Sequence, residues 1–146
     1  MSRKDIRHEI ADLLTVELAD LVSKKPNSED PAVYKGQVGD FAKARAVVVV
    51  SSAGTFGSLI AVKNLLGKHS IAVDIFVLYA DVEAGWDEED AEDLLDDISE
   101  KVLYTIEQHP IGNNWEALDW NEVSQTLPIE IGGNEYRRES IILKPS

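Results

Sequence analysis

The stretch "SIAVDIFVLYA", residues 70–80, decides the fold because it is the longest segment with strand character in the chain. Its β-branched and aromatic residues favour a strand, and alternate side chains of a strand point to opposite faces. One face therefore carries Ile71, Val73, Ile75, Val77 and Tyr79, and the other carries Ala72, Asp74, Phe76 and Leu78.

Asp74 is the one charged residue of this predicted strand. Two interpretations fit it: a strand-end or pairing role near the edge of the sheet, or a catalytic acid. We favour the structural role, so Asp74 is expected near a sheet edge.

A second strand is predicted at residues 45–52, "RAVVVVSS". Its nearly continuous β-branched run is typical of a strand that is covered on both faces. Residues 53–69 then separate the two strands and are too long for a tight hairpin turn. This excursion is apolar, so it must bury itself against its own core or another subunit. Its candidate subunit or partner contacts are Phe56, Leu59, Ile60, Val62, Leu65 and Leu66.

Two helices are predicted. The first covers Arg3–Lys24, with an apolar stripe in which Glu17 lies at the edge, and Pro26 follows it. The second begins in the acidic stretch "GWDEEDAEDLLDD", residues 85–97, where Asp87 can cap it and Trp86 can pack onto Ala91. His109 suits its carboxyl end, and Pro110 ends it.

The second helix is strongly amphipathic. Its apolar positions fall within an arc of roughly 120° and are Ala91, Leu94, Leu95, Ile98, Val102 and Ile106. The opposite side is the candidate acidic face, made of Glu92, Asp93, Asp96, Asp97 and Glu100. Like charges four residues apart each cost about 0.2–0.5 kcal/mol in an isolated helix. The face can be merely solvated, can meet a basic partner, or can repel phosphate.

The last part of the chain predicts strands at Trp115–Val123 and Glu135–Leu143, with a turn signal at Gly132-Gly133. We therefore predict an α+β fold over residues 1–146 as a single domain. It has a mostly antiparallel sheet, with the N-terminal helix and the second amphipathic helix packed on it.

The charge is concentrated. The chain has a net charge of −13, and residues 81–100 alone contain eleven acids and no base. Because phosphate neutralisation supplies most non-specific affinity, this composition argues against nucleic-acid binding. The chain has no cysteine, which removes disulfides and thiolate chemistry. The sequence shows neither a signal peptide nor a membrane span, so we expect a soluble protein made in the cytoplasm.

Tests for chemical motifs fail. The acidic stretch lacks the glycine that a calcium loop of the EF-hand type needs at its sixth position. Gly67-Lys68 is followed by His69, which does not fit a phosphate-binding loop. His8, His69 and His109 have no metal-ligand spacing. We expect no catalytic residue, no cofactor and no metal.

The order of elements, and the ending "ALDWNEVSQTLPIEIGGNEYRRESIIL" in particular, resembles the tail terminator (tail completion) proteins of long-tailed phages. The resemblance covers about residues 3–143 and implies a structural virion protein of the tail or neck, without enzymatic activity. Such proteins form homohexameric rings that cap the tail tube, end its polymerisation and join it to the head connector, while DNA passes through the ring. The implied partners are further copies of the chain, tail tube protein and a connector or stopper protein; no membrane is involved.

Under this resemblance, residues 53–69 would contact neighbouring subunits or the tube, and the acidic face would line the passage or meet a partner ring. Another head–tail joining ring, such as a stopper, is the alternative within the class. A small acidic binding module, which mimics DNA and occupies a basic protein, is the alternative from a different class.

Overall fold

The structure is a computed structural model that describes residues 3–36, 38–52, 70–124 and 129–146. Within these ranges it contains two helices and a six-stranded, mostly antiparallel sheet, so the predicted α+β class is confirmed. The elements in chain order are α1 (Arg3–Glu17), β1 (Val33–Tyr34), β2 (Ala46–Ser51), β3 (Ile71–Leu78), α2 (Glu88–Gln108), β4 (Leu118–Ser124), β5 (Ile129–Ile131) and β6 (Asn134–Pro145).

The sheet has the order β1-β2-β3-β6-β4, and β5 pairs with the first residues of β6. Among the described strands, only the β1–β2 pair is parallel. All eight residues of β3 are buried, because β2 and β6 flank it and both faces of the sheet are covered there. Residues 70–80 thus form the central strand, with its ends at Ile71 and Leu78.

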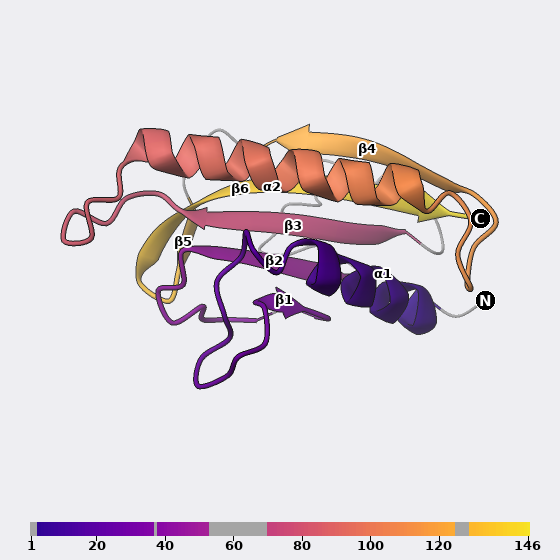
Figure 1. Ribbon diagram of the computed structural model, residues 1–146, viewed down its shortest axis with the longest axis horizontal. Helices are drawn as coiled ribbons and strands as arrows, with labels where there is room; N and C mark the ends of the chain where they lie inside the picture. The colour runs from indigo at the N-terminus through magenta and orange to yellow at the C-terminus, as the bar shows by residue number, and fades with distance from the viewer. Residues whose placement is uncertain (1–2, 37, 53–69, 125–128) are drawn as a thin grey trace.

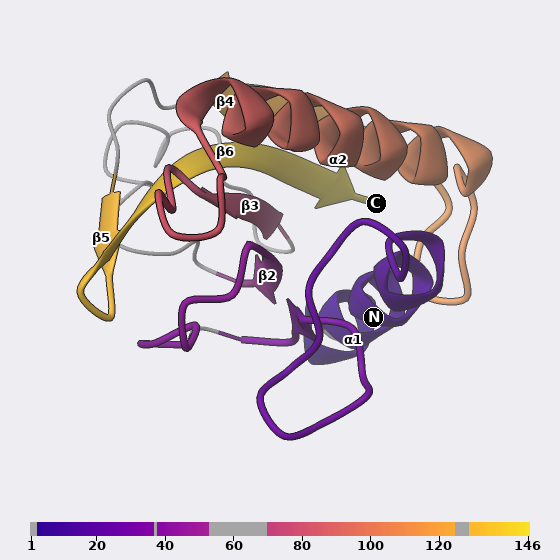
Figure 2. The same cartoon turned by 60° about the vertical axis from the view of Figure 1, so that its left-hand side comes forward.

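Both helices lie on the same face of the sheet (Figures 1 and 2). Their apolar sides pack with one face of the central strands, and this core cluster includes Val48, Val73, Ile75 and Ile141. A smaller cluster lies on the opposite face and includes Val49 and Phe76. The alternation predicted for residues 71–78 is confirmed, because odd-numbered apolar residues join the helix-side cluster and Phe76 and Leu78 join the other.

The smaller cluster fixes the segment that leads into β2. Phe41 packs its ring against those of Phe76 and Tyr136, at centroid distances of 5.0 and 5.3 Å. The Tyr136 hydroxyl donates a hydrogen bond of 2.8 Å to the carbonyl oxygen of Ala44. Tyr136 is completely buried, and burial, together with the negative charge of Asp40, raises its pKa to about 12.

The first helix is shorter than predicted: it ends at Glu17 rather than Lys24. The reason is a competing tertiary interaction at Ser23. Its amide donates to the carbonyl of Ala46, and its hydroxyl accepts from the Ala46 amide, at 3.0 and 3.1 Å. The chain must leave the helix to reach β2, although Leu18 remains fully buried.

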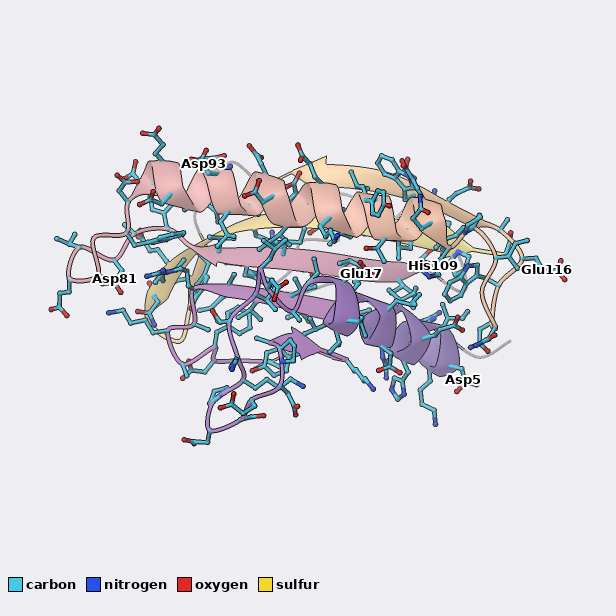
Figure 3. All side chains as sticks on the ribbon, viewed as in Figure 1. Asp5, Glu17, Asp81, Asp93, His109 and Glu116 are labelled. Atoms are coloured by element: carbon cyan, nitrogen blue, oxygen red, sulfur yellow. The ribbon has the colours of Figure 1, made fainter. Side chains whose placement is uncertain are left out.

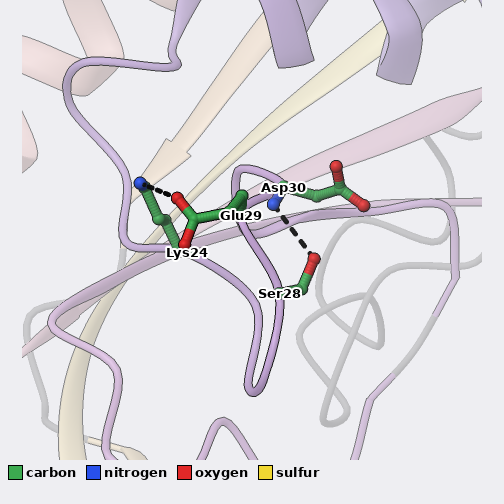
Figure 4. Close-up of polar contacts among 4 residues, drawn as sticks. All are labelled: Lys24, Ser28, Glu29 and Asp30. Atoms are coloured by element: carbon green, nitrogen blue, oxygen red, sulfur yellow. Dashed lines mark hydrogen bonds and ion pairs between the residues drawn. The ribbon is translucent and has the colours of Figure 1, made fainter.

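A tight turn follows, with Lys24 and Pro31 bridged across its base. Figure 4 shows the ion pair of 2.5 Å between Lys24 and Glu29 and the hydrogen bond from the Asp30 amide to the Ser28 hydroxyl. The hydrogen bond from Lys24, together with its positive charge, lowers the pKa of Glu29, but this pair is exposed and its role is local.

The last strands differ from the prediction at their ends. β4 begins at Leu118, not Trp115, because Trp115 folds inward and its ring N–H donates to the carbonyl of His109. A Cβ on Gly112 would lie 2.4 Å from that ring, so glycine is required there. The predicted turn at Gly132-Gly133 is confirmed: both have positive φ, and Ile131 pairs with Asn134 across it.

We predict that Tyr136→Phe lowers the free energy of unfolding by about 1 kcal/mol at pH 8, through loss of its hydrogen bond. In the wild type, the raised pKa means that the folded state holds the phenolic proton more tightly than the unfolded state. Stability should therefore fall from pH 10 towards pH 12, the interval between the ordinary pKa and about 12.

Urea unfolding at pH 8 and pH 11 measures both effects. The alkaline loss should be smaller in Tyr136→Phe than in the wild type, and an equal loss in the two proteins would refute the role of this phenol.

Candidate functional site

The second helix begins with a complete capping box. The Asp87 carboxylate accepts a bond of 2.9 Å from the Asp90 amide, and Asp90 accepts one of 3.1 Å from the Asp87 amide. Trp86 lies just before the cap, packs against the helix-side core, and donates its ring N–H to the Leu78 carbonyl at 2.7 Å. The predicted cap is confirmed, and Trp86 ties the start of α2 to the end of β3.

Four of the five predicted acidic residues of α2 are exposed: Asp93, Asp96, Asp97 and Glu100. Figure 3 shows Asp93 on the side of α2 that faces away from the sheet. The buried side carries Ala91, Leu95, Ile98, Val102 and Ile106, as the helical period predicted, whereas Leu94 is only partly buried. We call the four exposed carboxylates the acidic face. No ion pair reaches them from the part of the chain that the structure describes.

Glu92, the fifth predicted member, has a different environment. Its carboxylate pairs with the guanidinium of Arg137 on β6, and the Arg137 side chain is only 21% exposed. The Glu92 side chain is 43% exposed, so it is partly accessible, and its membership of the candidate acidic face stays a prediction. It lies at the flank of α2 that turns toward β6, where a cation from a distant part of the chain compensates it.

A second acidic surface lies between α1 and the carboxyl end of α2. It borders an open cavity of about 560 Å³, lined by Asp5, His8, Glu9, Asp12, Leu13, Val16, Glu17, His109, Asn113 and Asn114. Figure 3 shows Asp5, Glu17 and His109 around this side of the molecule. Sequence reasoning missed this neighbourhood, since the two histidines come from helices about a hundred residues apart.

Several lining residues already have structural partners. The Glu9 carboxylate accepts from the Asn113 amide at 3.0 Å and from the Asn114 side chain at 2.7 Å. Glu17 lies 3.7 Å from the Lys101 ammonium, which confirms its place at the edge of the α1 stripe. His109 Nδ1–H donates to the Thr105 carbonyl at 2.9 Å. These contacts hold the two helices and the following loop together.

Asp74 is not near a sheet edge, as the sequence interpretation expected, but in the middle of the central strand with no exposed surface. Its Oδ1 accepts a hydrogen bond from the hydroxyl of Ser140, its direct cross-strand neighbour on β6. Burial lowers the pKa of Arg138, and the negative charge of Asp74 acts in the opposite direction. The pairing role is thus correct, but its position is not.

The remaining sequence candidates, Phe56, Leu59, Ile60, Val62, Leu65 and Leu66, lie outside the described residues. Within the described ranges, no three histidine or carboxylate side chains are arranged to hold a metal ion. In the same ranges, neither helix has a stretch long and apolar enough to cross a lipid bilayer.

The fold and surface therefore define an α+β protein with an acidic, outward-facing helix. Comparison with known proteins finds no matching protein family, no matching curated protein and no matching solved structure.

We predict that replacing the acidic face with amides (Asp93→Asn, Asp96→Asn, Asp97→Asn, Glu100→Gln) stabilises the isolated protein by about 1 kcal/mol at low salt. The change removes the like-charge pairs four residues apart along α2. The gain should shrink at high salt, because salt screens exposed charges. Urea unfolding at two salt concentrations measures it.

Glu92→Gln is the matched control on the same helix. It should have the opposite effect and lower stability, because Arg137 would lose its partner. If both variants shift stability in the same direction, the assignment of Glu92 and the acidic face to different environments is incorrect.

Proposed function

We propose that this protein is a structural virion protein that forms a homohexameric ring on a phage tail tube, ends tube polymerisation and joins the tail to the head connector. In this role it acts by assembly and not by catalysis, with tail tube protein and a connector or stopper protein as partners. The site of action is the tail or neck of the virion.

The observation that carries the proposal is the order of elements: an N-terminal helix, a buried strand pair, an amphipathic helix and terminal antiparallel strands. This is the order on which the sequence resemblance rests. The exposed acidic face of α2 gives a second, weaker support. In a ring it would present carboxylates either to the passage, where they would repel DNA phosphates, or to a neighbouring ring.

The test is assembly of the purified chain. We expect negative-stain images to show closed rings, and light scattering to give six times the 16.1 kDa mass of one chain. Rings should form alone or on addition of tail tubes. A compact monomer that persists with both tail tubes and connector complexes would contradict the proposal. Binding to portal complexes but not to tube protein would instead identify another neck ring, such as a stopper.

A second candidate function is a small acidic module that mimics DNA and occupies a basic protein. The four carboxylates of the acidic face, which have no cationic partner in the described ranges, favour it. The four amide substitutions given above should then abolish binding to the basic partner. Under the ring proposal, the same variant should still assemble when the acidic face lines the passage.

A further inference from the structure

The two edges of the sheet are built differently. At one edge, β1 has only two residues, and the bridged turn at 24–31 leads into it. At the other edge, β4 is a seven-residue strand that pairs with β6 along its whole length. Among the described residues, no strand lies on the outer side of β4. An edge strand of this length normally needs a covering element or a blocking residue.

The register of β4 shows which backbone groups face outward. Ala117 and Ser146 exchange both backbone bonds, with the Ser146 amide to the Ala117 carbonyl at 2.9 Å and the reverse bond at 3.2 Å. In an antiparallel pair the bonded positions alternate, so Asp119 and Asn121 bond to β6. The amide and carbonyl groups of Leu118 and Trp120 therefore point away from the sheet.

The side chains of this edge do not block it. Asp119, Trp120 and Asn121 are exposed, and the exposed fraction of Trp120 is 37%. The strand contains no proline and no lysine, and its charged residues, Asp119 and Glu122, are acids, which oppose pairing with an acidic strand but not with a basic one. Among the described residues, the edge thus combines backbone groups that have no strand partner with an exposed tryptophan.

The negative charge around the β4 edge indicates which kind of partner strand can bind there. Residues 81–124, which include α2 and β4, contain fifteen acids and a single base, Lys101. Lys101 is itself paired with Glu17. Figure 1 shows β4 beyond β6, on the same side of the molecule as α2. A second copy would bring the same acids to the contact, and like charges would oppose that pairing.

We propose that the outer edge of β4 binds an extended, lysine- or arginine-rich segment of a partner protein by strand addition. The backbone of Leu118 and Trp120 would form the hydrogen bonds, the Trp120 ring would contact an apolar side chain, and the surrounding carboxylates would attract the basic ones. This inference does not depend on ring formation or on a virion role.

The probe is a short peptide that alternates valine with lysine, added to the full chain. We expect it to bind and to slow hydrogen exchange at the amides of Leu118 and Trp120. Two control peptides test the mechanism. One carries glutamate in place of lysine and should not bind. The other keeps the lysines but has methylated backbone amides on one edge; it should lose binding because it cannot add a strand.

Two variants at one position test the edge itself. Trp120→Pro removes an outward amide and leaves the bonds to β6 in place, because that amide does not face β6. Trp120→Thr removes the ring but keeps the amide. We expect Trp120→Pro to bind the lysine peptide about tenfold more weakly than Trp120→Thr does, as the loss of a strand hydrogen bond predicts. Circular dichroism verifies that both variants fold.

Three outcomes would overturn the proposal. Equal affinity of the two folded variants, or full binding of the methylated peptide, would mean that the peptide contacts only the charges of α2. A concentration-dependent dimer that Trp120→Pro dissociates, without peptide binding, would make a second copy the occupant. Absence of binding by the lysine peptide would leave the edge without this function. If Trp120→Pro does not fold, the methylated peptide and the hydrogen-exchange data on the wild type decide whether the peptide adds as a strand to β4.

Discussion

The rest of the structure depends on the burial of β3 from both sides. Its eight residues have essentially no exposed surface, so each face must be covered by a separate layer. On one face the two helices supply the cover, and on part of the other face the anchored segment around Phe41 and Ala44 does. Burial of apolar side chains is worth about 25 cal/mol per Å². This strand contributes side chains to both apolar clusters, as do its neighbours β2 and β6.

The same burial imposes a free-energy cost on the Asp74 carboxylate, which explains why polar residues lie next to it. A carboxylate in an apolar interior is tolerated only with hydrogen-bonding or charged neighbours. Ser140 supplies a hydroxyl from the directly opposite position on β6, and the Arg138 guanidinium lies near enough for the two charges to interact. The polar group thus favours one register between β3 and β6, since a shift by one residue would place Ile141 or the carboxylate of Glu139, and not the Ser140 hydroxyl, opposite Asp74.

The sequence alone predicted the fold class, the two faces of the central strand, the cap of α2 and the glycine turn. Each of these depends on local periodicity or local chemistry. It did not predict where α1 ends, because the hydrogen bonds of Ser23 with β2 are tertiary. It also did not predict the ion pair of Glu92, since nothing near Glu92 in the sequence indicates Arg137 as its partner. The position of β4 at the edge of the sheet could not be predicted either, because it depends on the strand order, which the pattern of residues does not determine.

The position of β6 has a consequence for how the chain is made. β6 lies between β3 and β4, yet it follows every other described element in the sequence. Until residues 134–145 leave the ribosome, β3 has an open edge and β4 has no partner strand. The apolar interior cannot close during synthesis, so the nascent chain exposes a strand that other chains can pair with. During synthesis the chain is therefore prone to pairing with other chains until β6 enters the middle of the sheet.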